Sequence, residues 1–337
     1  MLSFLIRRLL YAPLIIFGVM LLTFVLFFLV QSPETVARAQ LGKRANPKTI
    51  YEYLHKRGYD KPLFFYTHQQ RISPPEDGHP YASTGLFDTI FFNQMWNLAT
   101  FRFGVSDVTE RNLGEVFKEG AVPSLLLTLP AYLAGFAIAT GIALFLVFIR
   151  HSALDTVGAM ICIALMSIPA MVYIIFGQAV VALTLNYFPA FGFDRHGWDV
   201  LRFLLLPVSL IIVMHLGYDV RLYRAVFLEE IAQDYVRTAR AKGVPNARLL
   251  MVHVLKNGMI SLITLVVAHL PLLILGSLLV ESFFGIPGLG NLLVSAIGTG
   301  DLAVIRATTF LTSILYIIGL TLTDICYAMV DPRIRLS

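Results

Sequence analysis

The chain has 337 residues, of which 57% are hydrophobic and only 14% are charged, and its mean hydropathy is +0.74. This composition excludes a water-soluble globular domain of such a size and favours a protein of the lipid bilayer. The net charge of +5 then reflects how Lys and Arg are distributed across a membrane, and it does not indicate binding to nucleic acid.

Six stretches are long and apolar enough to cross a bilayer as helices, which takes about 20 residues each. They lie near residues 9–30, 121–149, 157–188, 203–220, 259–284 and 303–330. The first has no small-residue cleavage site before Gln31, so we expect a retained helix and not a signal peptide. We therefore predict an all-α polytopic membrane protein with an N-terminal helix (1–30), an enlarged extracytoplasmic segment (31–120) and a core (121–337).

Glycine and proline interrupt two of these spans. Pro169 and Gly177 lie in the third, and Pro207 and Gly217 lie in the fourth. Such breaks often flank a transport pathway, but Gly and Pro also kink ordinary membrane helices, and both interpretations remain open. The two cysteines, Cys162 and Cys326, fall inside spans and are interpreted as packing residues.

The short loops predict the orientation of the chain, because Lys and Arg accumulate on the cytoplasmic side. One side collects Arg7, Arg8, Arg150, Arg221, Arg224, Arg237, Arg240, Lys242, Arg248, Lys256, Arg333 and Arg335. The opposite short loops hold only Arg195, Arg202 and Arg306. We therefore expect both termini in the cytoplasm and residues 31–120 outside. Dense aromatic residues in that outer segment predict a small folded element at the membrane face.

A compact basic segment lies between the fourth and fifth spans. From Leu228 to Ala239, apolar or small side chains recur at the spacing of one helical face. Gly243 fits a left-handed position after the end of this helix, and Pro245 prevents its continuation. Asn246 is then expected to cap a second short helix over residues 246–257. The pattern predicts a helix-turn-helix platform at the cytoplasmic face; a basic helix resting on anionic lipid is the alternative.

Several strings in chain order resemble one family. RTARAKG (237–243) and HVLKN (253–257) resemble the EAA loop of the membrane permeases of binding-protein-dependent ABC importers, in the form of the dipeptide, oligopeptide and nickel class. Further similar strings are FLIRRLL (4–10), DKPLFFYTHQQ (60–70), FRFGVSDVTERNLGEVF (101–117), VESFFGIPGLGNLLVSAI (280–297) and YAMVDPRIR (327–335). The sequence departs from the general pattern at Arg237, where Glu is usual, and at Lys256, where Pro is usual.

The resemblance implies a type I ABC importer permease fold and a B-type permease subunit in a bacterial inner membrane. It implies a homologous second permease, two ATPase subunits that use ATP and Mg, and an extracytoplasmic binding protein, with no cofactor on this chain. Residues 229–257 would form the segment that couples to the ATPase. Its contact residues would be Asp234, Tyr235, Arg237, Thr238, Ala239, Arg240, Ala241, Lys242 and Gly243. Peptides are the expected cargo, with a nickel chelate as the alternative.

The sequence offers little chemistry of its own. It has no G-x-x-x-x-G-K-[ST] loop, no H-E-x-x-H pair and no G-x-S-x-G elbow, so neither nucleotide hydrolysis nor peptide hydrolysis is predicted. The glycine-rich run 284–291 is interpreted as a re-entrant turn that ends the fifth span. An ion-coupled transporter would be expected to show inverted repeats and several intramembrane charges, whereas Glu281, Asp219 and Asp324 are few and scattered.

Three polar residues in the spans are candidates for the transport pathway. Glu281 is costly to bury, and Ser277 lies four residues earlier on the same predicted face. They either line the route or its outer gate, or Glu281 makes a structural hydrogen bond to the glycine turn at 285–290. Asp219 stands where the resembled class usually has an apolar residue; it either pairs with a nearby Arg or belongs to the pathway. His215 and His269 are interpreted as hydrogen-bonded packing residues, and no metal site is predicted.

Overall fold

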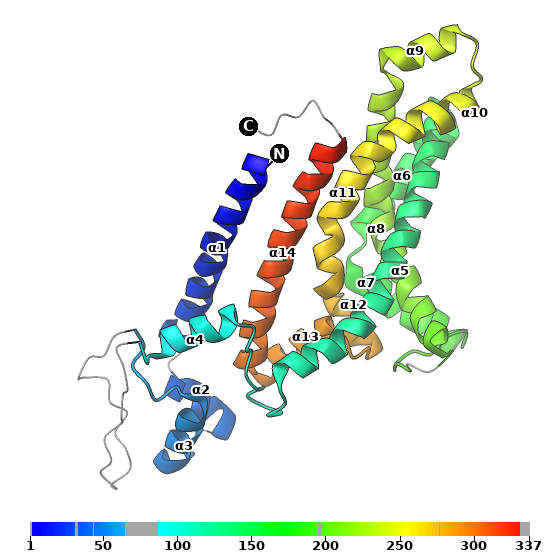
Figure 1. Cartoon of the computed structure of the whole chain (residues 1–337). Helices are drawn as coiled ribbons and strands as arrows, with labels where there is room; N and C mark the ends of the chain where they lie inside the picture. Colours follow the sequence, from blue (N-terminus) through cyan, green and yellow to red (C-terminus); the bar gives the residue numbers. More distant parts are fainter. Residues whose placement is uncertain are drawn as a thin grey trace. The chain divides into compact units, whose positions relative to one another are not determined.

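The computed structural model describes residues 2–30, 33–42, 44–64, 87–194, 197, 199–275 and 277–330 (Figure 1). Within these ranges the secondary structure is helical, and the only extended pairing is an isolated bridge between Val105 and Asn112. Contacts divide the chain into a larger unit (120–292 and 316–337) and a smaller unit (2–119 and 293–315). The all-α prediction is confirmed, and the two units are described in turn.

The helices of the described residues follow one another in this order. They are α1 (Leu2–Phe24), the π-helical η1 (Val25–Val30), α2 (Pro33–Leu41), α3 (Pro47–Arg57), α4 (Ile90–Ala99), α5 (Leu113–Phe148), α6 (Ala153–Ser167), α7 (Ala170–Gly177), η2 (Gln178–Thr184), α8 (Asp199–Ile231), α9 (Asp234–Ala241), α10 (Asn246–Arg248), η3 (Leu249–Val254), α11 (Leu255–Leu275), α12 (Leu278–Phe284), α13 (Leu289–Thr299) and α14 (Leu302–Val330).

Among the described residues, five helical stretches are long and apolar enough to cross a membrane: Tyr11–Leu29, Leu113–Phe148, Asp199–Ile231, Asn246–Val267 and Leu302–Thr323. Two pairs of helices pass the same test only when the two members of a pair are joined. These are Ala153–Ser167 with Ala170–Thr184, bent by 90°, and Leu278–Phe284 with Leu289–Thr299, bent by 82°. The seven residues of α12 span only about 10 Å, far less than the roughly 30 Å of hydrocarbon. Counting the first pair as one broken span and the second as a re-entrant segment gives six crossings, the number that the sequence predicts.

The predicted fifth span, residues 259–284, has the wrong limits. The helix begins at Asn246 and runs through η3 and α11 to Leu275, and α12 is a separate short helix. Ser277 has extended dihedral angles (φ −98°, ψ 102°) and is the residue before α12. The sequence has a Gly-Ser pair, Gly276 and Ser277, between these two helices; such pairs often kink helices, but a search for long apolar runs does not register them.

The prolines of the third and fourth spans behave differently. Pro169 precedes α7 at the 90° bend after α6, where its ring and the extended residue before it end one helix and start the next. Pro207 lies inside α8 without breaking it. Gly217 in α8 lets α6 approach closely, because a Cβ there would lie 2.5 Å from the carbonyl oxygen of Cys162. Cys162 is buried, as predicted; the side chain of Cys326 lies outside the described residues.

The smaller unit has an aromatic core. Phe24, Phe28, Tyr53, Tyr59 and Ile90 are buried together, with Phe24 packed edge-on against Phe91 at a centroid distance of 5.1 Å. These residues come from α1, η1, α3 and α4 and the loops between them. The prediction of a folded element in the segment 31–120 holds for the described part, while residues 65–86 lie outside it.

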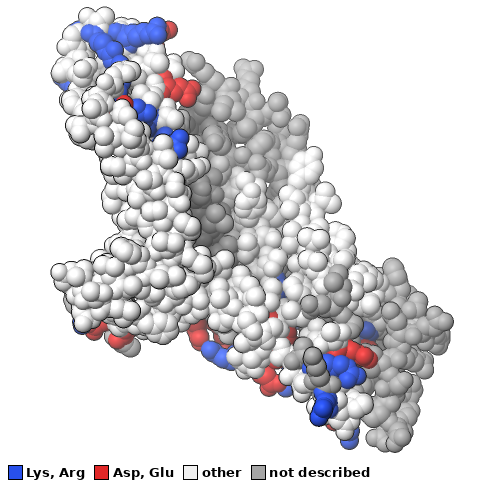
Figure 2. Space-filling model, turned by 180° about the vertical axis from the view of Figure 1, so that it is seen from behind, with Lys and Arg blue, Asp and Glu red and all other residues white. Residues whose placement is uncertain are grey.

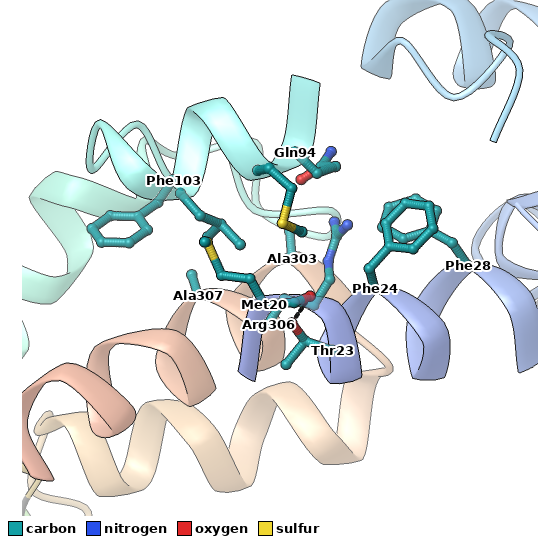
Figure 3. A pocket seen from close by; sticks show the side chains of 11 residues that line it. Met20, Thr23, Phe24, Phe28, Gln94, Phe103, Ala303, Arg306 and Ala307 are labelled. Carbon is teal, nitrogen blue, oxygen red and sulfur yellow. Dashed lines mark hydrogen bonds between the residues drawn. The ribbon is translucent and has the colours of Figure 1, made fainter. Parts of the chain in front are cut away.

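A small cavity lies within this unit, between α1, α4 and α14 (Figure 3). Figure 3 shows side chains from these helices and from the loop after α4 that line the cavity, among them Met20, Thr23, Gln94, Phe103 and Arg306. Its volume is about 30 Å³, which is room for two or three water molecules, since a water needs roughly 10–15 Å³. The cavity is too small for a transported solute.

Candidate functional site

The proposed coupling segment is centred on α9, which follows a break in the helix at Ala232 and Gln233. Val236 is completely buried and Ala239 is 9% exposed, and both pack with Leu249, Leu250 and other apolar residues of the larger unit. The remaining predicted contact residues are exposed: Asp234, Tyr235, Arg237, Thr238, Arg240, Ala241, Lys242 and Gly243. Helix α9 is thus held by its apolar side and presents its charged side outward.

The end of α9 is a Schellman turn. Gly243 has a φ of +80° and its N–H donates to the carbonyl of Arg240 at 3.0 Å. The N–H of Val244 donates to the carbonyl of Ala239 at 3.3 Å. This pair of bonds satisfies the last carbonyls of the helix and needs a left-handed residue at the glycine. The predicted helix end at Gly243 is confirmed.

Two local predictions for this segment are wrong. The amphipathic helix does not continue from Leu228, because α8 ends at Ile231 and α9 begins at Asp234. Asn246 does not cap a separate short helix: Pro245 is the residue before α10, and the helix continues without a gap into α11. The packing of Val236 and Ala239 against η3 provides the physical reason, since it requires α9 to turn across the end of α8.

Tyr235 connects the two sides of the break. Its hydroxyl donates to the carboxylate of Glu230 in the last turn of α8. Burial, with the neighbouring carboxylate, raises the pKa of Tyr235 to about 12. The hydroxyl therefore stays protonated at neutral pH and remains a donor to Glu230. Figure 2 shows Lys and Arg side chains gathered at the end of the larger unit that carries α9, beyond a broad surface without charges.

Glu281 is the most enclosed charged residue among the described residues of the larger unit, with no exposed surface. Its Oε2 accepts from the N–H groups of Gly290 at 2.8 Å and Asn291 at 3.1 Å, and its Oε1 accepts from the N–H of Ser277 at 3.2 Å. Gly290 and Asn291 open α13, so the carboxylate satisfies amides that have no partner within that helix and complements its dipole.

The glycine turn is built around this carboxylate. A Cβ at Gly288 would lie 2.3 Å from Glu281 Oε2 and 2.5 Å from Ser124 Oγ. Ser124 of α5 hydrogen-bonds Glu281 and accepts from the N–H of Leu289 at 2.8 Å. Glu281 therefore anchors the turn between α12 and α13, which is the structural alternative that the sequence left open. Sequence reasoning missed Ser124; a polar residue in an apolar span was its only signal.

A second, larger cavity lies within the larger unit and has a volume of about 350 Å³. Its walls come from α5, α8 and α11, with Ser277 at one side. Polar and aromatic lining residues are Tyr132, Phe136, His215, Tyr218, Asp219 and Ser277. Asp219 and Ser277 are thus brought to one cavity, and Glu281 is not among the residues that line it. Sequence reasoning missed the tyrosines, because aromatic residues are common in apolar spans.

His215 and Asp219 belong to one face of α8, since they are four residues apart. His215 Nδ1 lies 2.9 Å from the carbonyl oxygen of Ile211, which can only accept, so Nδ1 carries a proton. The predicted hydrogen bond of His215 is confirmed, but the ring is exposed and lines the cavity. The side chain of His269 lies outside the described residues. Within the described part of the chain, no group of three or more His, Cys, Asp or Glu residues could hold a metal ion.

The basic residues next to Asp219 engage another helix. Arg224 Nη2 donates to Asp155 Oδ2 at 2.8 Å, and Arg221 Nη1 lies 3.6 Å from Met166 Sδ. Asp155 and Met166 both belong to α6. Residues two apart on a helix do not face each other, so Arg221 and Asp219 point to different sides of α8.

The sequence matches the family described as the binding-protein-dependent transport system inner membrane component over residues 131–336, and the N-terminal part of such components over residues 1–73. A Brucella abortus (strain 2308) protein, described provisionally as a peptide transport system permease, is 32% identical over 246 residues, 72% of this chain and 78% of that protein. The glutathione transport system permease protein of Shigella flexneri serotype 5b is 29% identical over 335 residues, 99% of each chain. The chain therefore belongs to this family: it is a multi-pass membrane protein and the permease subunit of an ABC importer, whose partner ATPase subunits hydrolyse the ATP.

Proposed function

We propose that this permease imports short peptides, and that α9 is the helix through which a partner ATPase drives it. In this proposal the chain pairs with a homologous second permease. Two ATPase subunits, which bind ATP and Mg, attach at the cytoplasmic side, and an extracytoplasmic binding protein delivers the peptide. The relatives described as peptide and glutathione permeases support this cargo.

One observation carries the coupling role: α9 exposes its charged residues while Val236 and Ala239 fix it to the rest of the unit. A helix that only rested on lipid would be expected to turn apolar residues toward the bilayer, whereas the apolar side of α9 is packed against other residues of the protein. The exposed side is thus left for a polar partner such as a groove on a cytoplasmic ATPase.

The chain on both sides of α9 leads to the cavity. Helix α8, which precedes it, carries Asp219, and the continuous run from Asn246 to Leu275, which follows it, carries Leu265. A displacement of α9 by the closing ATPase dimer would therefore move two cavity walls together. This is the physical basis that we propose for alternating access, with substrate entering from the binding protein when the cavity opens outward.

The orientation follows from the same segment. With α9 on the cytoplasmic side and six crossings, both termini lie in the cytoplasm and residues 31–120 lie outside, where the binding protein docks. The excess of Lys and Arg in the short loops on the α9 side supports this orientation.

Cysteine cross-linking in the assembled importer tests the coupling role. In a background without Cys162 and Cys326, Thr238→Cys on the exposed side of α9 is expected to cross-link to the ATPase. The matched control is Ile161→Cys on α6, which is 55% exposed and is expected to give no such product. Products at neither position, or at both equally, would contradict the proposal.

Uptake into proteoliposomes tests the cargo. The complete importer is expected to accumulate short peptides only with ATP and Mg, and vanadate is expected to stop this uptake. Failure to take up any peptide, in a complex whose ATPase responds to its binding protein, would exclude peptides as the cargo and leave the coupling role standing.

A further inference from the structure

Helix α4 of the smaller unit turns polar side chains inward and an aromatic one outward. Asn93 Nδ2 donates to Asp88 Oδ1 at 3.0 Å, and Gln94 lines the small cavity (Figure 3). Trp96, by contrast, is 67% exposed. A helix whose outer side faced water would be expected to show the opposite pattern. The outer side of α4 is therefore suited to an apolar phase.

Exposed aromatic residues also lie just before and just after α4. Phe87 is 69% exposed and packs edge-on against Phe92, with a centroid distance of 4.9 Å. Phe92 and Trp96 are four residues apart and share one face of the helix. Phe101, which follows the helix, is 56% exposed. Trp is enriched where proteins meet the membrane interface, and a series of exposed aromatic side chains marks a surface that contacts another apolar surface.

The amides that follow α4 have partners within the protein, as contact with lipid requires. The N–H of Phe101 donates to the carbonyl of Leu98 at 3.0 Å, and the N–H of Arg102 donates to the carbonyl of Asn97 at 2.8 Å. These bonds also satisfy carbonyls at the end of the helix. The side chain of Arg102 is exposed and is long enough to reach lipid phosphates from below the membrane surface.

The depth of α4 follows from its contacts with α1 and the first part of α14, which belong to the same unit. Near the start of α4, Phe91 packs against Phe24 of α1 at a centroid distance of 5.1 Å. Near its end, Leu98 is buried together with Met20 of α1 and Phe310 of α14. Helix α4 therefore descends along α1 from the level of Phe24 to the level of Met20.

Arg306 marks the level at which charged groups end. Its guanidinium carbon lies 4.8 Å from the centroid of the Phe28 ring, and apart from Arg306 the membrane-crossing stretches of α1 and α14 contain no charged residue. Phe310 lies roughly 6 Å past Arg306 along α14, and Met20 lies roughly 12 Å past Phe28 along α1. The end of α4, which contacts both, is thus roughly 6–12 Å inside that level, comparable with the insertion of about 5–10 Å typical of interfacial helices.

We propose that residues 90–103 are embedded in one leaflet of the bilayer, with Trp96 and Phe101 in contact with lipid acyl chains. In the orientation proposed above this is the outer leaflet, and only that designation depends on the proposed function. The embedded helix holds the folded part of residues 31–120 at a fixed height on the bilayer, on the side where the binding protein docks.

Spin labels measure this depth. In an assembled importer without other cysteines, Phe87→Cys, Trp96→Cys and Phe101→Cys are labelled one at a time with a nitroxide and reconstituted into vesicles of phosphatidylethanolamine and phosphatidylglycerol. Oxygen concentrates in hydrocarbon and a water-soluble nickel chelate in water, so the ratio of their collision rates with the label increases with depth. The aqueous control is Glu110→Cys, since the side chain of Glu110 is 62% exposed in the same unit.

The ratio is expected to be higher at Trp96 and Phe101 than at Glu110. The label at Phe101 is expected to lie deeper than the one at Phe87 by roughly 6 Å, which is the descent of α4 along α1. Ratios equal to that of the control would overturn the proposal, because they indicate contact with water. Labels shielded from both reagents would also overturn it, because they indicate contact with another subunit.

The three positions are probed separately, so a variant that fails to assemble leaves the other two to decide. The measurement needs neither peptide nor ATP. A result that contradicts the embedded helix therefore leaves the proposed cargo and the coupling role of α9 standing, and a failure of peptide uptake leaves the depth measurement valid.

Discussion

Arg57 and Asp107 form a buried ion pair in the smaller unit, with Nε and Oδ1 2.8 Å apart and side chains only 9% and 2% exposed. Asp107 Oδ2 also accepts from the N–H of Ala303 at 2.9 Å. Asp301 completes the cluster, since its Oδ1 accepts from the N–H groups of Asp107 and Val304, both at 3.1 Å. The start of α14 is therefore fixed to the loop before α5 by carboxylates.

Removing one member of this pair is expected to destabilise the smaller unit. Asp107→Ala leaves the guanidinium of Arg57 buried without its carboxylate, which typically costs about 3–5 kcal/mol. The midpoint of heat-induced unfolding of the purified complex, followed by Trp96 fluorescence with Trp198→Phe, should fall. The control is the exposed pair beside it, Lys56 with Glu110, whose side chains are 64% and 62% exposed. Glu110→Gln should not shift the midpoint, and an equal shift in both variants would contradict the buried-pair argument.

Gly288→Ala is expected to disrupt the turn around Glu281. The new Cβ would lie 2.3 Å from Glu281 Oε2 and 2.5 Å from Ser124 Oγ, and overpacking of this kind costs about 1–3 kcal/mol. The yield of assembled complex and its unfolding temperature should both fall. Gly298→Ala in α13 is the matched control: a Cβ there meets nothing within 4 Å, so it should be neutral or stabilise the helix by up to about 1 kcal/mol. Equal behaviour of the two variants would show that the turn tolerates a side chain.

Glu281→Gln separates anchoring from a role in the pathway. Glutamine keeps one acceptor oxygen but places an NH₂ group toward amides that also donate, so at least one buried N–H loses its partner at a cost of about 1–3 kcal/mol. We expect lower thermal stability and an uptake rate per assembled complex close to that of the unmodified protein. Uptake that is lost while stability is unchanged would instead place Glu281 in the pathway.

The sequence predicts those features whose signals are local. Apolar runs locate the spans because crossing a bilayer needs length and hydrophobicity only, and Gly243 with Pro245 marks the end of α9 because the backbone there must turn left-handed. The break at Ala232 and Gln233 has no comparable signal. It results from the packing of Val236 against η3, which no window of neighbouring residues contains.

Hydrogen-bond partners and cavity neighbours that are far apart in the sequence could not be predicted either, because no window of neighbouring residues contains both of them. A buried carboxylate at Glu281 predicts that partners exist, but Ser124 bonds to Leu289 across 165 positions of the chain. Likewise Asp219 stood out as an unusual residue, while its neighbours Tyr132 and Ser277 come from distant segments. The chemistry of a site can thus be anticipated from one costly residue, but the composition of its walls depends on how the helices pack.

Asp88 predicts an acid-sensitive contact in the smaller unit. Its Oδ1 accepts from Lys61 Nζ at 2.5 Å and from Asn93 Nδ2 at 3.0 Å, and the bond from Lys61 in particular lowers the pKa of Asp88 below its ordinary 3.8. A carboxyl whose pKa is lower in the folded protein stabilises it fully above the ordinary value. That stability is lost as the pH falls through the lowered pKa, so the relevant window lies below about pH 4.

Fluorescence of Trp96, in the helix α4 that follows Asp88, measures this loss in a variant with Trp198→Phe. The smaller unit should become easier to unfold as the pH falls below about 4, and Asp88→Asn should reduce that dependence. Asp234→Asn on α9, where the side chain is 96% exposed, is the control and should leave the acid dependence unchanged. The same acid dependence in Asp88→Asn as in the unmodified protein would assign it to other carboxylates.

Substitutions of Gly243 test whether the left-handed turn after α9 is needed to couple ATP hydrolysis to uptake. Nothing lies within 4 Å of a Cβ added there, and φ is +80°, so Gly243→Ala costs only the conformational penalty, about 1 kcal/mol. A penalty of that size reduces the population of the intact turn about fivefold and should lower peptide uptake per ATP hydrolysed without preventing assembly. Gly243→Asn should keep more of the coupling, since Asn adopts left-handed dihedral angles more readily than Ala. Equal uptake per ATP in the glycine, asparagine and alanine forms would show that the turn after α9 does not limit coupling.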